Sequence, residues 1–487
     1  MTSAVGSSTS SVSGLASGID TTSLVNQLMQ IEAQPQAQLQ GALTRTQADA
    51  AAYRDINSSF AALATAARAL TSTDSWGLTK ASSSDASVTA TASSGAASGA
   101  LTFTVDQLAT THSVMSATQW QHSTDAYGLG STLTIKSTDG TTTIGTIPLT
   151  SSTSGPASLD DAVAAINKSG LGLSAAAIKT TTGYSLQVTA GGTGAAKAFQ
   201  IQSDTDTTGA DYKVATAGLD AQISFANPND PTTPYTSTSA TNSFADVIAG
   251  TTFTVSQQGA KATVTVASDP SAIAAKVKTM VDAANTVLAK IKQYTDSSTG
   301  SNAPLKGDYS LSQLSGQVLD AVSSAVGTSL VDANKKLITS SAGSNGLQLT
   351  KDGTLTFDSG AFTTAWTTNP ALAQAIFGGG LGVGVDNIPN TPDDTVLTDG
   401  VGARLQALAN RASDSAAGML TSLASGQDVE AKDIQSQIDD WTTRLASRKA
   451  TLVAQFTAME TALGTLKNQS SWLSSQINSL PTMSKSN

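Results

Sequence analysis

The sequence predicts a multidomain α+β protein with coiled-coil helices at both termini, a helical leg domain and β-rich head domains inserted into the leg. Apolar residues that recur every three or four positions near both ends predict the helices. Alternation of apolar and polar residues between the ends predicts strands. The pattern changes most clearly near Pro270, so we place a domain boundary there.

The strongest helical pattern lies near the C-terminus, where apolar residues are three, four or seven positions apart. This spacing puts them on one narrow stripe, as in a coiled-coil seam. A shorter run follows a candidate helix cap at Asp20 or Thr21. The predicted self-association residues of this terminal coil are Leu24, Leu28, Ile31, Ile434, Ile438, Trp441, Leu445, Leu452, Phe456, Met459, Leu463, Leu466, Leu473, Ile477 and Leu480. On spacing alone, an intramolecular helical hairpin fits the seam as well as assembly between chains does.

The helices of the leg domain are predicted from periodicity and from their end signals. A helix over about 38–70 follows Pro35, which should end or kink the preceding helix. Another helix is expected to begin at Pro270, because proline fits the first turn of a helix. Further helices are predicted at about 310–326 and 401–423.

The strands are predicted from alternation and from turn residues. Residues 131–205 read as two strands, a helix and a strand, with Ser158-x-x-Asp161 at the start of the helix. Residues 226–243 contain three prolines and are predicted to be a loop. Hairpins are predicted over 253–266 and over 347–357.

The two helical regions can meet only if the β-rich part is an insertion, which we place at about 81–270. The predicted domains are a terminal coiled-coil region (1–44 and 430–487), a helical leg domain (45–80 and 271–429), an inner β-rich head domain (81–120 and 226–270) and an outer β-α-β head domain (121–225).

Composition argues against several classes of function. The net charge is −10, and residues 81–275 hold 13 Asp and 6 Lys but no Glu or Arg, so nucleic acid is not an expected partner. The absence of cysteine excludes disulfides and thiolate metal sites. No run of 18 apolar residues occurs, so we expect no membrane insertion. The N-terminal stretch lacks the basic and apolar regions of a Sec signal peptide.

Candidate chemical motifs are weak. The glycine-rich run 378–384 lacks the Gly-Lys-Ser/Thr ending of a phosphate loop, and the aspartates of 386–399 do not match a calcium loop. The histidines are His112 and His122, and no Gly-x-Ser-x-Gly nucleophile elbow frames a helix start. We therefore expect no enzyme, no catalytic residues, no cofactor and no metal.

Five stretches resemble the bacterial flagellar hook-associated protein 2 family, whose members cap the flagellar filament. These stretches are SGLASGID at 13–20, the hairpin and helix of 253–285 with MVDAAN at its end, PLKGDYSL at 304–311, KDGTLTFD at 351–358 with Asn369-Pro370 and Ile376-Phe377 after it, and QFTAME at 455–460. They follow the order of the family across nearly the whole chain. Residues 131–190 also resemble the β-α-β insert of flagellin-class proteins.

The resemblance implies an extracellular homo-oligomeric ring at the tip of the flagellum. It favours a pentamer, although the number of subunits varies among relatives. Such a cap promotes flagellin folding, insertion and polymerisation and prevents monomer leakage. The implied partners are flagellin, the hook-filament junction proteins and a cytosolic export chaperone at the C-terminal helix. Export would use the flagellar type III apparatus, without a Sec signal peptide. The alternative function is a surface adhesin that binds mucin or glycan through its β-rich head.

Overall fold

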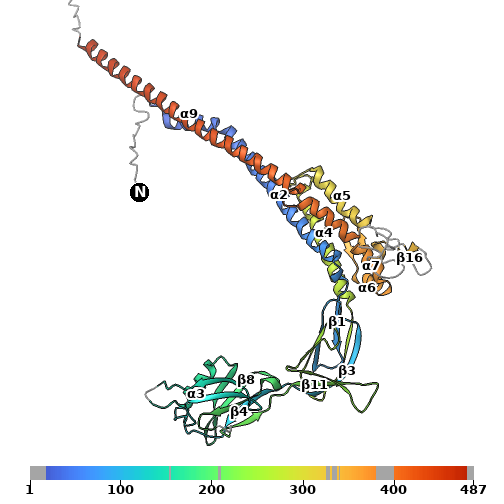
Figure 1. Ribbon diagram of the computed structural model, residues 1–487. Coiled ribbons are helices and arrows are strands. Elements are labelled where there is room, and N and C mark those ends of the chain that lie inside the picture. Colours follow the sequence, from blue (N-terminus) through green and yellow to red (C-terminus); the bar gives the residue numbers. More distant parts are fainter. Residues whose placement is uncertain are drawn as a thin grey trace, which may run out of the picture. The chain divides into compact units, whose positions relative to one another are not determined.

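The computed structural model describes residues 18–152, 155–206, 210–324, 330–331, 337–338, 341–379 and 400–479. The chain forms two compact units (Figure 1). Met1–Thr71 and Lys276–Asn487 form one, which we call the helical unit, and Ser72–Ala275 form the other, the β unit. Long helices in one part and antiparallel sheets in the other confirm the predicted α+β class.

The helical unit is built from long helices and two short hairpins. Its helices are α1 (Thr21–Glu32), α2 (Gln34–Thr71), α4 (Pro270–Thr295, which starts in the β unit), α5 (Tyr309–Ser323), α6 (Ser359–Thr368), α7 (Pro370–Phe377), α8 (Val401–Ser413) and α9 (Met419–Asn478). The hairpins pair β16 (Leu330–Val331) with β17 (Leu337–Ile338) and β18 (Leu347–Leu349) with β19 (Leu355–Phe357). The helix start at Pro270 and the hairpin within 347–357 are confirmed.

One face of α2 forms much of the core of this unit. Its buried residues recur at spacings of three and four, and α2 contacts both α8 and α9. They are Tyr53, Ile56, Phe60, Leu63, Ala67 and Leu70. Polar contacts lie beside this core at the half-buried Asp55, whose Oδ2 accepts hydrogen bonds from Lys290 Nζ at 2.5 Å and from Tyr294 Oη at 2.7 Å.

The predicted single helix over 401–423 is wrong, because α8 ends at Ser413 and α9 begins at Met419. The Asp414 carboxylate accepts hydrogen bonds from the backbone N–H groups of Ala416 and Ala417. Such local side-chain bonds offer the backbone an alternative to the helix. From Met419 onward, α9 runs unbroken for 60 residues.

Two sheets pack face to face at one end of the β unit, and we call this part the inner sandwich. One sheet has the order β1 (Thr79–Ser83), β15 (Lys261–Ser268), β3 (Gly99–Gln107), β11 (Ala221–Phe225), β12 (Tyr235–Ser239). The other has the order β13 (Ser243–Ala245), β14 (Thr251–Val255), β2 (Val88–Ala92). Their common core includes the stacked rings of Phe103, Phe253 and Phe244.

Two further sheets and one helix enclose a second core, and we call this part of the β unit the outer sandwich. One sheet has the order β10 (Tyr212–Thr216), β4 (Thr111–Ser116), β8 (Gly183–Thr193), β7 (Leu173–Thr180). The other has the order β6 (Thr143–Pro148), β5 (Thr132–Ser137), β9 (Phe199–Ser203), and α3 (Leu159–Lys168) packs with them. The capping box of Ser158 and Asp161 at the start of α3 is confirmed. The sequence prediction for residues 131–205 omitted β7 and β9.

Two further predictions for the β unit are corrected. Residues 253–266 do not form a hairpin, because β14 pairs with β2 and β13 whereas β15 pairs with β1 and β3. Phe253 and Val264 are both buried in the same core, which they reach from opposite sheets. Residues 226–243 are not only loop, because β12 starts directly after the last of the three prolines and pairs with β11.

The finer division into four domains stays a prediction. In the structure, the chain passes from β3 of the inner sandwich to β4 of the outer sandwich through residues 108–110. It returns from β10 to β11 through residues 217–220.

Candidate functional site: the terminal coil

The terminal coil is an antiparallel pairing of α9 with α1 and α2 (Figure 1). Gln36 Nε2 donates a hydrogen bond to Thr442 Oγ1 at 2.7 Å. Four residues earlier in the chain, Glu32 Oε1 pairs with Arg448 Nε at 3.0 Å. The partners on α9 advance while those on α1 and α2 recede, which defines the antiparallel direction.

The predicted seam of α9 is covered near its start and open near its end. Ile434, Ile438 and Leu452 are buried against the helices of the same chain. Trp441, Leu445, Phe456 and Leu463 are half-buried. Met459, Leu466, Leu473 and Ile477 are exposed, with 54% exposure at Leu473 and 58% at Ile477. Leu480 lies outside the described residues.

The buried face of the short helix α1 differs from the face predicted to take part in self-association. Thr21 and Val25 are buried, whereas Leu24, Leu28 and Ile31 are exposed. Thr21 and Val25 are four positions apart, so helical spacing allows either face to pack. Sequence reasoning missed Val25 because the competing face carries three larger apolar residues.

A groove of about 770 Å³ opens where α1 ends and α2 begins. The break between the helices falls at Ala33, the C-cap of α1, two residues before Pro35. The Arg444 guanidinium lies 4.6 Å from the centroid of the Trp441 ring, a cation–π distance. The lining residues are Ile31, Glu32, Pro35, Trp441, Arg444, Leu445, Ser447, Arg448 and Thr451. Apolar side chains of α1, α2 and α9 therefore remain accessible to another molecule at this break.

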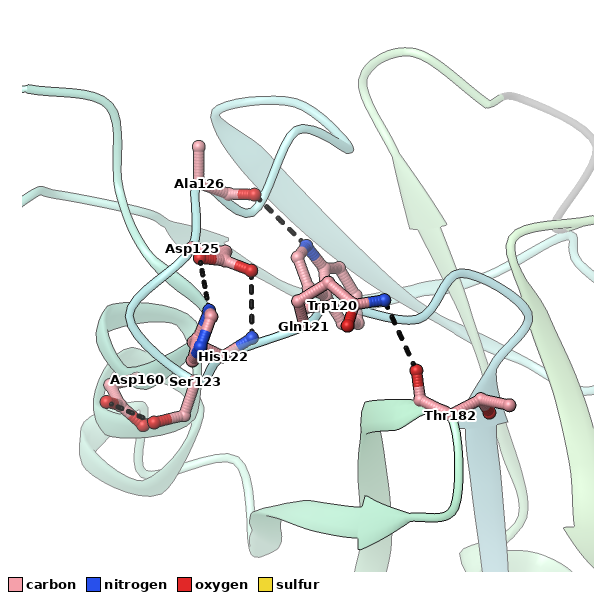
Figure 2. A network of polar contacts seen from close by, with 8 residues as sticks. All are labelled: Trp120, Gln121, His122, Ser123, Asp125, Ala126, Asp160 and Thr182. Atoms are coloured by element: carbon pink, nitrogen blue, oxygen red, sulfur yellow. Dashed lines mark hydrogen bonds and ion pairs between the residues drawn. The ribbon is translucent and has the colours of Figure 1, made fainter.

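The polar residues around the exposed His122 form separate pairs. Ser123 Oγ donates a hydrogen bond to Asp160 Oδ2 at 2.9 Å, and Nδ1 of the His122 ring lies 3.5 Å from Asp125 Oδ1. Figure 2 shows these two pairs. In the part of the chain that the structure describes, no hydrogen bond joins Ser123 to the ring of His122, whose side chain is 77% exposed. A nucleophile needs a base within hydrogen-bond reach, so these four residues do not form a triad.

Metal and phosphate sites receive no support from the ranges described. Across those ranges, no three His, Asp or Glu side chains gather into a group that could hold a metal ion. Most of the glycine-rich run and the aspartates of 386–399 lie outside the described residues. None of the helices in the described ranges combines the length and the apolar character needed to cross a membrane.

Comparison with protein families matches most of the chain. The family model described as flagellar hook-associated protein 2 C-terminus matches residues 218–468, and the corresponding N-terminus model matches residues 17–112. The flagellin hook IN motif matches residues 132–192. A search of the curated proteins finds no match.

Solved structures include similar folds. The D1-D2-D3 domains of the flagellar cap protein FliD from Escherichia coli are 21% identical, with a TM-score of 0.56 over 77% of this chain and 99% of that one. FliD (HAP2) from Pseudomonas aeruginosa PAO1 is 24% identical over 44% of this chain and 99% of that one, with a TM-score of 0.34. The first likeness supports the fold. The family models match most of the described helices and strands, while β9, β10, most of β4 and α9 beyond residue 468 lie outside the matched ranges. This chain therefore belongs to the flagellar hook-associated protein 2 family.

Proposed function

We propose that this chain is a flagellar filament cap protein whose copies associate through their terminal helices into a ring at the filament tip. The cap function follows from membership of the family. The ring, which we expect to be a pentamer, and its mode of association are our own inference. The comparisons give no support to the adhesin alternative, and we do not propose it.

The observation that carries the proposal is the exposed apolar end of α9. Leu466, Leu473 and Ile477 are more than half exposed on a helix that continues beyond the buried positions of its seam. Full burial of a Leu or Ile side chain stabilises an interface by about 1.5–3 kcal/mol. Burial of these three residues against other copies therefore contributes several kcal/mol per chain.

The proposed mechanism is mechanical and involves no catalysis. Flagellin would fold and insert beneath a ring that limits the escape of monomers. We propose the hook-filament junction proteins as further partners. The exposed end of α9 is a suitable target for a cytosolic export chaperone, which would keep it from associating early. Export through the flagellar type III apparatus would then bring the chain to the filament tip.

The test compares the sedimentation of the full-length protein with that of the double variant Leu473→Asp/Ile477→Asp. We expect the wild-type chain to sediment as one oligomer and to form closed rings in negative-stain images. The double variant should sediment as a monomer with unchanged helix content, because both positions are exposed within the single chain. Buried unpaired carboxylates would oppose association.

Val429→Asp is the matched control, since Val429 is 62% exposed on the same helix but lies before the seam. This variant should remain oligomeric. Rings formed by the double variant would contradict the role of the terminal coil. A monomeric wild-type chain would contradict the ring itself.

A further inference from the structure

We propose that the His112 side chain joins the two connections between the inner and outer sandwiches through a hydrogen bond that acid weakens. His112 is the second residue of β4, which follows the outgoing connection 108–110, and it is 3% exposed. Its ring reaches the return connection 217–220 through Gly218. This inference concerns the β unit and is independent of the terminal coil.

The hydrogen bonds of His112 define one form of the imidazole. Nε2 lies 2.8 Å from the backbone oxygen of Phe199, a carbonyl that can only accept, so Nε2 carries a proton. The backbone N–H of Gly218 donates to Nδ1 at 3.2 Å, so Nδ1 carries none. The site therefore holds the neutral ring in a single tautomer.

The surrounding contacts show that the ring sits where the two connections meet. Thr110 N donates to Leu219 O at 2.9 Å, and Thr110 Oγ1 donates to Ala217 O at 2.6 Å. A side chain at Gly218 would place its Cβ 3.0 Å from the Cβ of His112 and 2.9 Å from Gly194 O. The return connection can approach His112 this closely only because residue 218 is glycine.

Protonation of Nδ1 would place two N–H groups opposite each other at Gly218. The hydrogen bond to the return connection would be lost, and a charge would be buried. The ionisable residues on the segments around the ring are the exposed Lys197 and Lys213 and the half-buried Asp220. Within the described ranges none of them contacts the imidazole, and Asp220 Oδ1 instead accepts from Ala195 N at 2.8 Å. Acid should therefore loosen the two connections.

Hydrogen exchange of the full-length protein tests this inference locally. Peptides that cover 108–112 and 216–220 are compared at pH 7.5 and pH 5.0, after correction for the intrinsic effect of pH on exchange. In the wild-type chain we expect protection of both segments to fall about tenfold in acid, which corresponds to the loss of one hydrogen bond. His112→Asn offers an oxygen for the Gly218 N–H and cannot become charged, so its protection should not change with pH.

His122→Asn is the control, because that histidine is exposed; it should behave like the wild-type chain. The same pH profile in His112→Asn and in the wild-type chain would overturn the inference. Spectra of the wild-type chain with nitrogen-15-labelled histidine decide the question even if His112→Asn does not fold, since the chain has only 2 His. A proton on Nδ1 of His112 at pH 7.5, or a doubly protonated ring with both segments still protected at pH 5.0, would also overturn it.

Discussion

Asn285 should be one of the most important polar side chains of the helical unit, because it ties helix α4 to the hairpin β18–β19. Its Nδ2 donates to Leu355 O at 2.8 Å, and its Oδ1 accepts from Leu355 N at 2.8 Å. The amide thus satisfies both backbone groups of Leu355, a residue that is only 3% exposed. Asn285→Ala removes both hydrogen bonds and leaves the buried N–H and C=O of Leu355 without these partners.

The expected cost follows from these two bonds. Each bond contributes about 1 kcal/mol, and each buried group left without a partner adds a desolvation penalty. We therefore expect the free energy of unfolding to fall by about 2–4 kcal/mol. Helix propensity, which favours alanine over asparagine by less than about 1 kcal/mol, offsets part of this loss. Urea unfolding followed by circular dichroism at 222 nm is a suitable assay. Among the described residues, every α-helix except the 10-residue α3 and the first residues of α4 belongs to the helical unit.

Lys278→Ala on the same helix is the control. Lys278 pairs with Asp282 at 2.7 Å, but both side chains are more than half exposed. Exposed pairs contribute little, so the control should change the free energy of unfolding by less than about 0.5–1 kcal/mol. The reasoning would be refuted if Asn285→Ala cost no more than this control.

Three further predictions concern ionisable groups and a helix cap. Burial, and then the nearby Glu430 carboxylate, raise the pKa of Asp49, so the folded state favours the neutral carboxyl. The free energy of unfolding should therefore fall as pH rises through the range in which carboxyl groups lose their proton. Asp49→Asn should therefore raise the thermal midpoint at pH 7 but not at pH 3. Hydrogen bonds from Ser158 and Ser152 lower the pKa of Asp161 to about 2, so its contribution is present at neutral pH and is lost as pH falls below about 4 towards 2. Ser158→Ala should destabilise α3 by about 1 kcal/mol, measured as faster hydrogen exchange of residues 159–168.

Signals that act over a few residues predicted local structure well. The capping box of Ser158 and Asp161, the helix start at Pro270 and the hairpin around Lys351-Asp352-Gly353 all depend on neighbours in the sequence. Their physical causes are a cap bond, a fixed φ angle and a turn, and each of these is encoded locally.

Predictions that required knowledge of packing failed. Alternation in β14 and β15 indicates that each strand has one buried face, but it does not say which sheet each strand joins. One local signal was also missed: the Asp414 carboxylate accepts from the backbone N–H groups of Ala416 and Ala417, which the apolar spacing does not reveal. Likewise, only the position of α9 decides that Val25 rather than Leu24 faces inward.

For the candidate site, the sequence predicted the long helix but not the extent of its cover. Ile434 and Leu473 belong to the same predicted apolar stripe, yet Ile434 is buried and Leu473 is 54% exposed. The difference arises because the antiparallel helices α1 and α2 cover the early part of α9, where Glu32 pairs with Arg448. We propose that other copies of the chain cover the remaining part of α9.

The most direct test is complementation of a bacterium that lacks its own filament cap protein and carries the flagellin matched to this chain. Flagellin is measured in the culture medium and in filaments sheared from the cells. We predict that the wild-type chain retains flagellin in filaments, whereas Leu473→Asp/Ile477→Asp is exported but leaves flagellin in the medium. Normal filaments with the double variant, or leakage with the wild-type chain, would contradict the proposal that this protein caps the filament through its terminal coil.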